Sequence, residues 1–263
     1  MGLLQILAIV GLACLGSGYA EDVYVVCDLK DTSTDYIKVF KAPADTDTLA
    51  FTEVFGYHYW SSVRSIAVDD SKGCIYFDEF YKDSVMKYCE ATGTSELVIP
   101  KDSGEDYVEH VTLDEAGDTL YFCNYAGDVF KVDLTAADPS TTLQKIASPG
   151  RVLSTAIHGR YMYMTIYYQT GSAFGTRDIR KLHLDDPYEV TIVTSARNID
   201  GLVYDAGAAE EDDALYFAWS KDNDNQVISR YDFKTNSATE VSDTYVGSNY
   251  LAAYSIALLT EAY

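Results

Sequence analysis

One short apolar motif recurs five times along this chain of 263 residues, and its spacing constrains the fold more than any other feature. The copies, each ending near a turn, are Ser65–Asp69, His110–Asp114, Ser154–His158, Gly201–Asp205 and Ser255–Leu259. Successive copies start 45, 44, 47 and 54 residues apart. These intervals lie at or just above the period of a four-stranded propeller blade. The spacing therefore predicts a repeat protein of the propeller type.

Each repeat contains four strand-like runs separated by residues that favour tight reversals. The clearest unit has runs at 65–69, 74–78, 84–89 and 96–99. Gly and Asp residues lie between its runs, as expected of turns between paired strands. The same pattern recurs in the three units that start at His110, Ser154 and Gly201, and no helix signal of useful length interrupts them. The pattern predicts an all-β chain.

The two ends of the chain supply the remaining runs. Val23–Val26, Tyr36–Phe40 and Phe51–Phe55 match the second, third and fourth strands of a unit, and Tyr254–Leu259 matches a lone first strand. Pairing the strand near Ile256 with that near Tyr24 would close the ring without exposed edges. The sequence thus predicts a five-bladed β-propeller of four-stranded blades closed by N- and C-terminal strands, with six blades as the alternative.

The first twenty residues have the pattern of a secretory signal peptide. Leu3–Leu15 is apolar, and Gly18 and Ala20 place small residues at the minus-three and minus-one positions before Glu21. A membrane anchor is the alternative, but the apolar run is shorter than the roughly 20 residues that a span needs. We expect a signal peptide at 1–20, one propeller domain at 21–263, and a secreted, extracellular protein.

Acidic residues dominate the composition. The chain has 41 Asp and Glu against 19 Lys and Arg, a net charge of -22. This charge repels nucleic acid and anionic membranes, so we expect neither as a partner. The acids are scattered except for the block Glu210–Asp213, a pattern more typical of a solvated surface than of a mineral- or calcium-binding tract. An extracellular protein or glycan is the expected partner.

In three units a short apolar first run is followed by a second run that contains Tyr-Phe: Ile66–Asp69 with Ile75–Asp78, Val111–Asp114 with Leu120–Phe122, and Asp200–Asp205 with Leu215–Phe217. These units resemble the YWTD repeats of LDL-receptor-type β-propellers. Phe stands where that family has Trp, and only Asp78 remains of the family's Thr-Asp pair. The usual blade count of the family is six. The resemblance implies a propeller fold and extracellular ligand binding, without a specific ligand.

The cysteines agree with secretion, because four follow the signal peptide: Cys27, Cys74, Cys89 and Cys123. Cys74 and Cys89 lie on the second and third runs of one unit, where a hairpin would bring them opposite each other. We expect a disulfide between them, with free buried thiols as the alternative. Cys27 and Cys123 belong to units that a whole blade separates, so they need not touch.

Loops that join second to third strands, and fourth strands to the next blade, share one face of a propeller. Aromatic residues, Tyr107 among them, are concentrated in these loops. Exposed aromatic rings on loops are typical of a contact surface. The alternative is that the rings fold back as plugs between blades. Thr165–Arg177 is the longest of these loops. The predicted ligand-binding face comprises Tyr57, His58, Tyr59, Trp60, Tyr81, Tyr125, Tyr167, Tyr168, Phe174 and Trp219.

No catalytic motif stands out. The four histidines, His58, His110, His158 and His183, lie in no nucleophile, zinc or triad motif. His110 and His158 are interpreted as core histidines, with a proton-transfer role near the channel as the alternative. Asn198, Asp200 and Asn249 match, in residue type, the calcium ligands of lactonase-like propellers. Asp222–Asn225 is interpreted as a hairpin turn, because it lacks the spacing of an EF-hand.

The leading functional prediction is a secreted, acidic, non-enzymatic binding or matrix protein that acts through the aromatic loop face and has no cofactor. One alternative is a calcium-dependent lactonase-like hydrolase. The other is an acidic matrix component associated with calcium or mineral, for which Glu210–Asp213 is the only clustered block of acids.

Overall fold

The computed structural model describes the segments that carry nearly all of the predicted strands. For some strand residues it describes the backbone only. The described residues are 6–9, 22–30, 35–43, 52–58, 63, 65–69, 71–79, 82–100, 107–114, 116–167, 177–186, 188–195, 199–205, 213–220 and 226–244.

These residues form five four-stranded antiparallel sheets, and in every sheet the spatial order of the strands follows the chain. The first sheet contains β1 (Ile6–Ile9), β2 (Asp22–Lys30), β3 (Asp35–Pro43) and β4 (Thr52–His58). The second contains β5 (Ile66–Asp69), β6 (Cys74–Glu79), β7 (Ser84–Cys89) and β8 (Thr94–Ile99). The third contains β9 (Val108–Leu113), β10 (Thr119–Asn124), β11 (Val129–Asp133) and β12 (Gln144–Ala147).

The fourth sheet contains β13 (Arg151–His158), β14 (Tyr161–Tyr167), β15 (Arg177–His183) and β16 (Glu189–Ser195). The fifth contains β17 (Ile199–Asp205), β18 (Ala214–Ser220), β19 (Gln226–Asp232) and β20 (Ser237–Thr244). A 3-10 turn at Pro139–Thr142 lies between β11 and β12.

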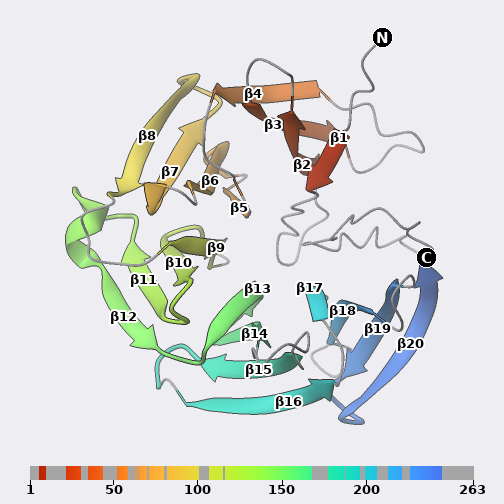
Figure 1. The fold of residues 1–263 in the computed structure, drawn as a ribbon. Coiled ribbons are helices and arrows are strands. Elements are labelled where there is room, and N and C mark those ends of the chain that lie inside the picture. The colour runs from red at the N-terminus through yellow and green to blue at the C-terminus, as the bar shows by residue number, and fades with distance from the viewer. Residues whose placement is uncertain are drawn as a thin grey trace.

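The sheets lie around a common centre, with the first strand of each sheet innermost and the fourth at the periphery (Figure 1). Thus β5, β9, β13 and β17 face the centre, and β8, β12, β16 and β20 form the outer wall. This arrangement confirms the all-β prediction and the four-strand units. The strands begin and end close to the predicted runs because alternating apolar residues and turn residues are local signals.

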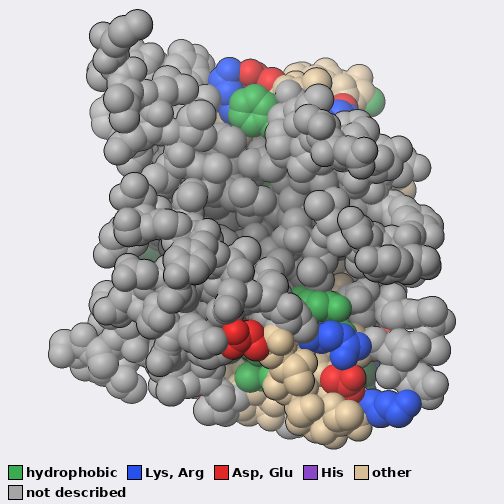
Figure 2. All heavy atoms as spheres, turned by 90° about the vertical axis from the view of Figure 1, so that its right-hand side faces the viewer, with side chains coloured by type: hydrophobic (Ala, Val, Ile, Leu, Met, Phe, Trp, Pro, Cys, Tyr) green, Lys and Arg blue, Asp and Glu red, His purple; other side chains and the backbone are tan. Residues whose placement is uncertain are grey.

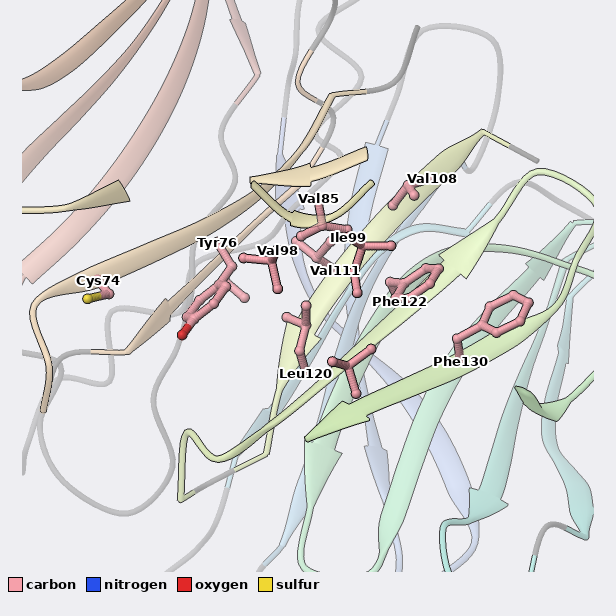
Figure 3. Packing of buried hydrophobic residues seen from close by; sticks show 12 residues of the cluster. Cys74, Tyr76, Val85, Val98, Ile99, Val108, Val111, Leu120, Phe122 and Phe130 are labelled. Carbon is pink, nitrogen blue, oxygen red and sulfur yellow. The ribbon is translucent and has the colours of Figure 1, made fainter. Parts of the chain in front are cut away.

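Apolar side chains packed between neighbouring sheets form the core. Tyr76 and Ile99 of the second sheet pack with Val111, Phe122 and Phe130 of the third (Figure 3). The rings of Phe122 and Phe130 stack with their centroids 5.0 Å apart. Full burial of one such side chain contributes about 1.5–3 kcal/mol. Further clusters join the first sheet to the second, the third to the fourth and the fourth to the fifth, so packing between sheets holds this arrangement together.

Polar contacts also link the inner strands of successive sheets. The Ser65 hydroxyl accepts a hydrogen bond from the Val111 amide at 2.7 Å and donates to the Val111 carbonyl at 3.2 Å. The Ser65 amide itself donates to buried Asp78 Oδ1 at 2.7 Å. These bonds tie the entry of β5 to the middle of β9 and give the amide and hydroxyl of Ser65 partners inside the core.

Lys72 joins the second and third sheets at the opposite end. Its Nζ lies 3.1 Å from Asp69 Oδ2, 2.9 Å from the Gly117 carbonyl oxygen and 3.2 Å from Asp118 Oδ1. Asp69 is buried, and its hydrogen bond to Lys72 is the largest of the causes that raise the pKa of Lys72. The lysine is therefore held in its charged form between the two turns.

The third and fourth strands carry partly exposed charges of both signs in contact. Lys38 pairs with Glu53 at 2.5 Å, and Arg230 pairs with Asp232 at 2.9 Å. Figure 2 views the flank on the right of Figure 1 and shows acidic and basic side chains side by side in the described surface at its top and bottom. Exposed pairs of this kind contribute about 0–1 kcal/mol each. No described helix is long and apolar enough to span a bilayer.

The predicted disulfide between Cys74 and Cys89 is confirmed. The two residues are direct partners in the β6–β7 register, with Cα atoms 4.1 Å apart. Cys123 is a buried free thiol, and burial raises the pKa of that thiol. The side chain of Cys27 lies outside the description.

The pairing beside β2 differs from the expected closure. The neighbour of β2 there is β1, in an antiparallel register that pairs Ile6 with Leu29 and Ile9 with Val26. Residues 1–20 were predicted to be a signal peptide. Ile6–Ile9 nevertheless has the short apolar pattern that the inner strands share. The strand near Ile256 lies outside the described residues, as does the rest of 245–263.

Candidate binding site

Five residues from the third and fourth sheets meet at one end of their strands: Tyr107, Glu109, Tyr125, Arg151 and Tyr167, which we term the Arg151 cluster. Tyr107 precedes β9, which carries Glu109, and Tyr125 follows β10 directly. Arg151 opens β13, and Tyr167 closes β14 as the register partner of Arg151. The cluster therefore lies at the end where second strands finish and first strands begin, which is the face predicted to bind a ligand.

A two-point ion pair joins Arg151 to Glu109 at the centre of the cluster. Arg151 Nε donates to Glu109 Oε2 at 2.7 Å, and Nη2 donates to Oε1 at 2.6 Å. The Glu109 side chain is 2% exposed, whereas that of Arg151 is 26% exposed. The hydrogen bonds that Arg151 donates to Glu109 are the main cause of the raised pKa of Arg151. The pair is charged, geometrically fixed and neutral overall.

Two tyrosine rings flank the guanidinium. Its Cζ lies 4.2 Å from the ring centroid of Tyr125 and 5.4 Å from that of Tyr167. Both distances fall within the range of cation–π attraction. The Tyr125 amide donates to the Tyr107 carbonyl oxygen at 2.7 Å. Because Tyr107 is 43% and Tyr125 47% exposed, two residues with hydrogen-bonded backbones both present aromatic side chains to solvent, and the ring of one of them lies beside a fixed arginine.

A close approach of two glycines places Tyr125 against Arg151. Gly127 and Gly150 have φ angles of 93° and 104°, a region that only glycine enters easily. The Gly150 amide donates to the Gly127 carbonyl oxygen at 3.3 Å. A Cβ on Gly127 would lie 2.5 Å from the Gly150 carbonyl carbon. The β10–β11 turn can therefore dock on the β12–β13 connection, and Tyr125 reaches Arg151.

Asp128 fixes the same turn from its other side. Its Oδ1 accepts a hydrogen bond from Ser148 Oγ at 2.7 Å and lies 2.6 Å from Lys145 Nζ. Burial raises the pKa of Asp128, but these two partners more than offset it, so that the pKa lies below its usual value. The turn is thus held to the β12–β13 connection by its backbone and by a charged side chain.

The structure brings together two residues of the predicted face, Tyr125 and Tyr167. Tyr57 and His58 end β4, and Trp219 lies in β18 opposite Ile199 and Val227, but none of their side chains is described. The other predicted residues lie outside the described chain. These are Tyr59, Trp60, Tyr81, Tyr168 and Phe174.

The sequence did not point to Arg151 or Glu109. Arg151 follows Pro149-Gly150 at the start of a strand, and Glu109 lies beside Val108 on another. A charged residue at the entry of each of two inner strands was the available signal. Their pairing depends on contacts between residues that are 42 positions apart.

The histidines whose side chains are described contact neighbouring side chains or backbone amides. His110 Nδ1 lies 3.2 Å from Thr155 Oγ1, and burial lowers the pKa of His110 to about 4. The His110 side chain is half-buried on β9 and has this polar partner on the neighbouring sheet. His183 Nδ1 accepts hydrogen bonds from the Asp185 and Asp186 amides at 3.3 and 3.1 Å, so it organises a turn.

His158 belongs to a packed cluster at the other end of the fourth sheet. Its ring stacks on Tyr204 at 4.3 Å between centroids, and its Nε2 lies 4.0 Å from Asp213 Oδ2. The Tyr204 hydroxyl donates to the same Asp213 oxygen at 2.5 Å. This arrangement joins the fourth and fifth sheets, and the His158 side chain within it is 34% exposed.

The calcium hypothesis rests on residues whose side chains are not described. Asp200 lies in β17, whereas Asn198, Asp222–Asn225 and Asn249 fall outside the described chain. Among the side chains that are described, no group of three or more His, Cys, Asp or Glu could hold a metal ion.

No family model matches the sequence, and no curated protein matches it. Solved structures do resemble the fold. One is a chain in a crystal structure of a nidogen/laminin complex, with 11% identity, a TM-score of 0.54 and coverage of 80% of this chain and 90% of that chain. Another is hydrazine synthase from Kuenenia stuttgartiensis, with 12% identity, a TM-score of 0.54 and coverage of 80% and 63%. At such identity the likeness shows the fold alone, and with the ring of four-stranded sheets it identifies a β-propeller-like protein.

Proposed function

We propose that this chain is a secreted, non-enzymatic binding or matrix protein, and that its partner is an extracellular protein or glycan. The binding face is the end of the sheets that carries the Arg151 cluster. In the finer description the fold is a five-bladed propeller with divergent YWTD-like repeats, and 1–20 is a signal peptide.

The arrangement of Arg151 carries this proposal. The guanidinium is fixed by buried Glu109 and lies over Tyr125, while Tyr107 and Tyr125 remain exposed. Tyrosine and arginine dominate the residues that contribute most to protein interfaces. Side chains that are already held in place lose little conformational entropy on binding. A preorganised aromatic surface of this kind is suited to recognition, because its ordering cost is met in the free protein.

The disulfide and one structural neighbour support the extracellular setting. Cys74–Cys89 is a bond that forms and persists in oxidising compartments. The neighbour from the nidogen/laminin complex shows this kind of fold within a complex of two proteins. By analogy, we assign this chain a partner-binding role.

The experiment is a screen of the secreted protein against arrays of glycans and extracellular-matrix proteins, with and without calcium. Each hit is then mapped by hydrogen exchange. The proposal requires that a bound partner protect the backbone near Tyr107 and Tyr125, rather than the turn at 184–188, where Tyr188 is 52% exposed. Protection confined to the opposite end would overturn the assigned face. Hydrolysis of a lactone that is lost with chelator and with Asp200→Ala would support the hydrolase instead.

A further inference from the structure

We propose that the exposed Tyr107–Tyr125 surface binds a cationic segment of a partner protein, with a lysine or arginine of the partner stacked on a tyrosine ring. This inference rests on the proposed binding function and specifies the chemistry of the partner. Three features of the chain support it. The nearby described cations are paired with carboxylates, the net charge of the chain is negative, and one aromatic ring of the cluster already contacts a guanidinium.

Two described cations near this surface, Arg151 and Lys145, are paired with carboxylates. Arg151 is bound at two points by Glu109, and Lys145 lies 2.6 Å from Asp128. A cation arriving at Tyr125 therefore meets neutral ion pairs. An anionic ligand would have to compete with Glu109 for Arg151, and Glu109 is 2% exposed. Breaking such a pair is costly, because it leaves a buried charge without its partner.

Long-range charge favours the same choice. The net charge of -22 attracts cations and repels sulfated or sialylated glycans. Asp102, Glu105 and Asp106 precede Tyr107 within five positions in the sequence. Charges act over about 8 Å at physiological ionic strength, so the net negative charge attracts a cationic ligand as it nears the surface.

The cluster itself shows that its tyrosines accept a cation. The Arg151 guanidinium lies 4.2 Å from the Tyr125 ring centroid, which is the geometry that a partner's arginine would adopt on an exposed ring. Neutral sugars also stack on tyrosine, but they gain nothing from the net charge. The combination of exposed rings, matched local cations and excess acid therefore favours a basic protein segment over a glycan.

The test uses the full secreted chain and two probes: a synthetic lysine-rich peptide, and the same peptide with every lysine acetylated. Affinity is measured by fluorescence anisotropy at low and at physiological salt. Four variants are compared with the wild type: Tyr107→Leu, Tyr125→Leu, Tyr125→Phe and, as a control at the opposite end, Tyr188→Leu. Leucine keeps apolar surface but removes the aromatic face, whereas phenylalanine keeps that face.

The expected result has three parts. The lysine peptide binds and the acetylated peptide does not, with affinity falling as salt rises. Tyr107→Leu and Tyr125→Leu each weaken binding about two- to fivefold, the effect of one exposed cation–π contact. Tyr125→Phe and Tyr188→Leu bind as the wild type does. Thermal melts of all variants establish that the leucine effects are not losses of folding.

Three outcomes overturn the inference. Equal binding of the acetylated peptide, with loss on Tyr125→Leu, would show a binding face that does not read charge, so the proposed function would survive alone. Lysine-peptide binding that no leucine variant weakens would place the cation elsewhere on the acidic surface. A screen that finds only glycans on this face would also reject the cationic partner while retaining the face.

Discussion

The carboxylate of Glu109 and the guanidinium of Arg151 meet at two hydrogen bonds of 2.7 and 2.6 Å although the residues belong to different sheets. The contact joins the inner strands of the third and fourth sheets at the end that carries the exposed tyrosines. The Glu109–Arg151 pair therefore has two roles. It links two sheets, and it orients the guanidinium that lies over the ring of Tyr125.

Removing the Glu109 carboxylate should lower the stability of the fold and leave the Arg151 guanidinium less well fixed. Breaking a buried ion pair costs about 3–5 kcal/mol, and partial exposure of Arg151 reduces this to about 1–3 kcal/mol for Glu109→Gln. Urea denaturation measures the change. Arg151→Lys, which keeps the charge but loses the two-point geometry, should lose part of the same free energy. A Glu109→Gln variant as stable as the wild type would show that the pair does not link the sheets.

The close approach of Gly127 and Gly150 should tolerate no side chain. Gly127→Ala adds a Cβ at 2.5 Å from the Gly150 carbonyl carbon, in a backbone with φ of 93°. Gly159→Ala is the matched control, because its φ is 54° and nothing lies within 4 Å of the added Cβ. Strain alone costs about 1–2 kcal/mol. Thermal melting should therefore show a larger loss for Gly127→Ala than for the control. Equal losses would contradict the close approach.

Stability should fall in mild acid because of His110. Its pKa is about 4 in the folded chain against 6.5 in the unfolded one, so only the unfolded state binds the proton between these values. Stability is therefore complete above pH 6.5 and declines as the pH falls to 4, by on the order of 2–3 kcal/mol. Urea denaturation at a series of pH values measures the slope. His110→Asn, which lacks a titrating ring, should flatten it, and an unchanged slope would assign it to other groups.

The strands and the disulfide could be predicted because their signals are local. Cys74 and Cys89 lie in adjacent strands of one hairpin, so turn residues fix their register. Arg151 and Glu109 could not be predicted as a pair, since their contact depends on how two separate sheets pack. The strand at Ile6–Ile9 was missed for another reason: its apolar pattern serves equally for a signal peptide and for an inner strand.

Removal of residues 1–20 as a signal peptide would also remove β1, and its effect on stability can be predicted. In a chain that starts at Glu21, β2 lacks β1, and we expect the first-strand pattern at Ser255–Leu259 to replace it. Chain 21–263 should then melt near the full chain, whereas 21–244 leaves an inner edge unpaired. A loss of about 2 kcal/mol would lower the melting temperature by about 4–8 °C. Equal melting of 21–263 and 21–244 would show that the C-terminal segment does not pair there.

The most direct test of the binding face compares two tyrosines of similar exposure at opposite ends of the strands. Tyr125 is 47% and Tyr188 52% exposed. The measurement is the Kd of the strongest partner from the extracellular screen for wild type, Tyr125→Ala and Tyr188→Ala, with melts of all three. A central interface residue contributes about 2 kcal/mol or more, so Tyr125→Ala should weaken binding about 30-fold while Tyr188→Ala leaves it unchanged. Wild-type affinity in a folded Tyr125→Ala protein would contradict the account.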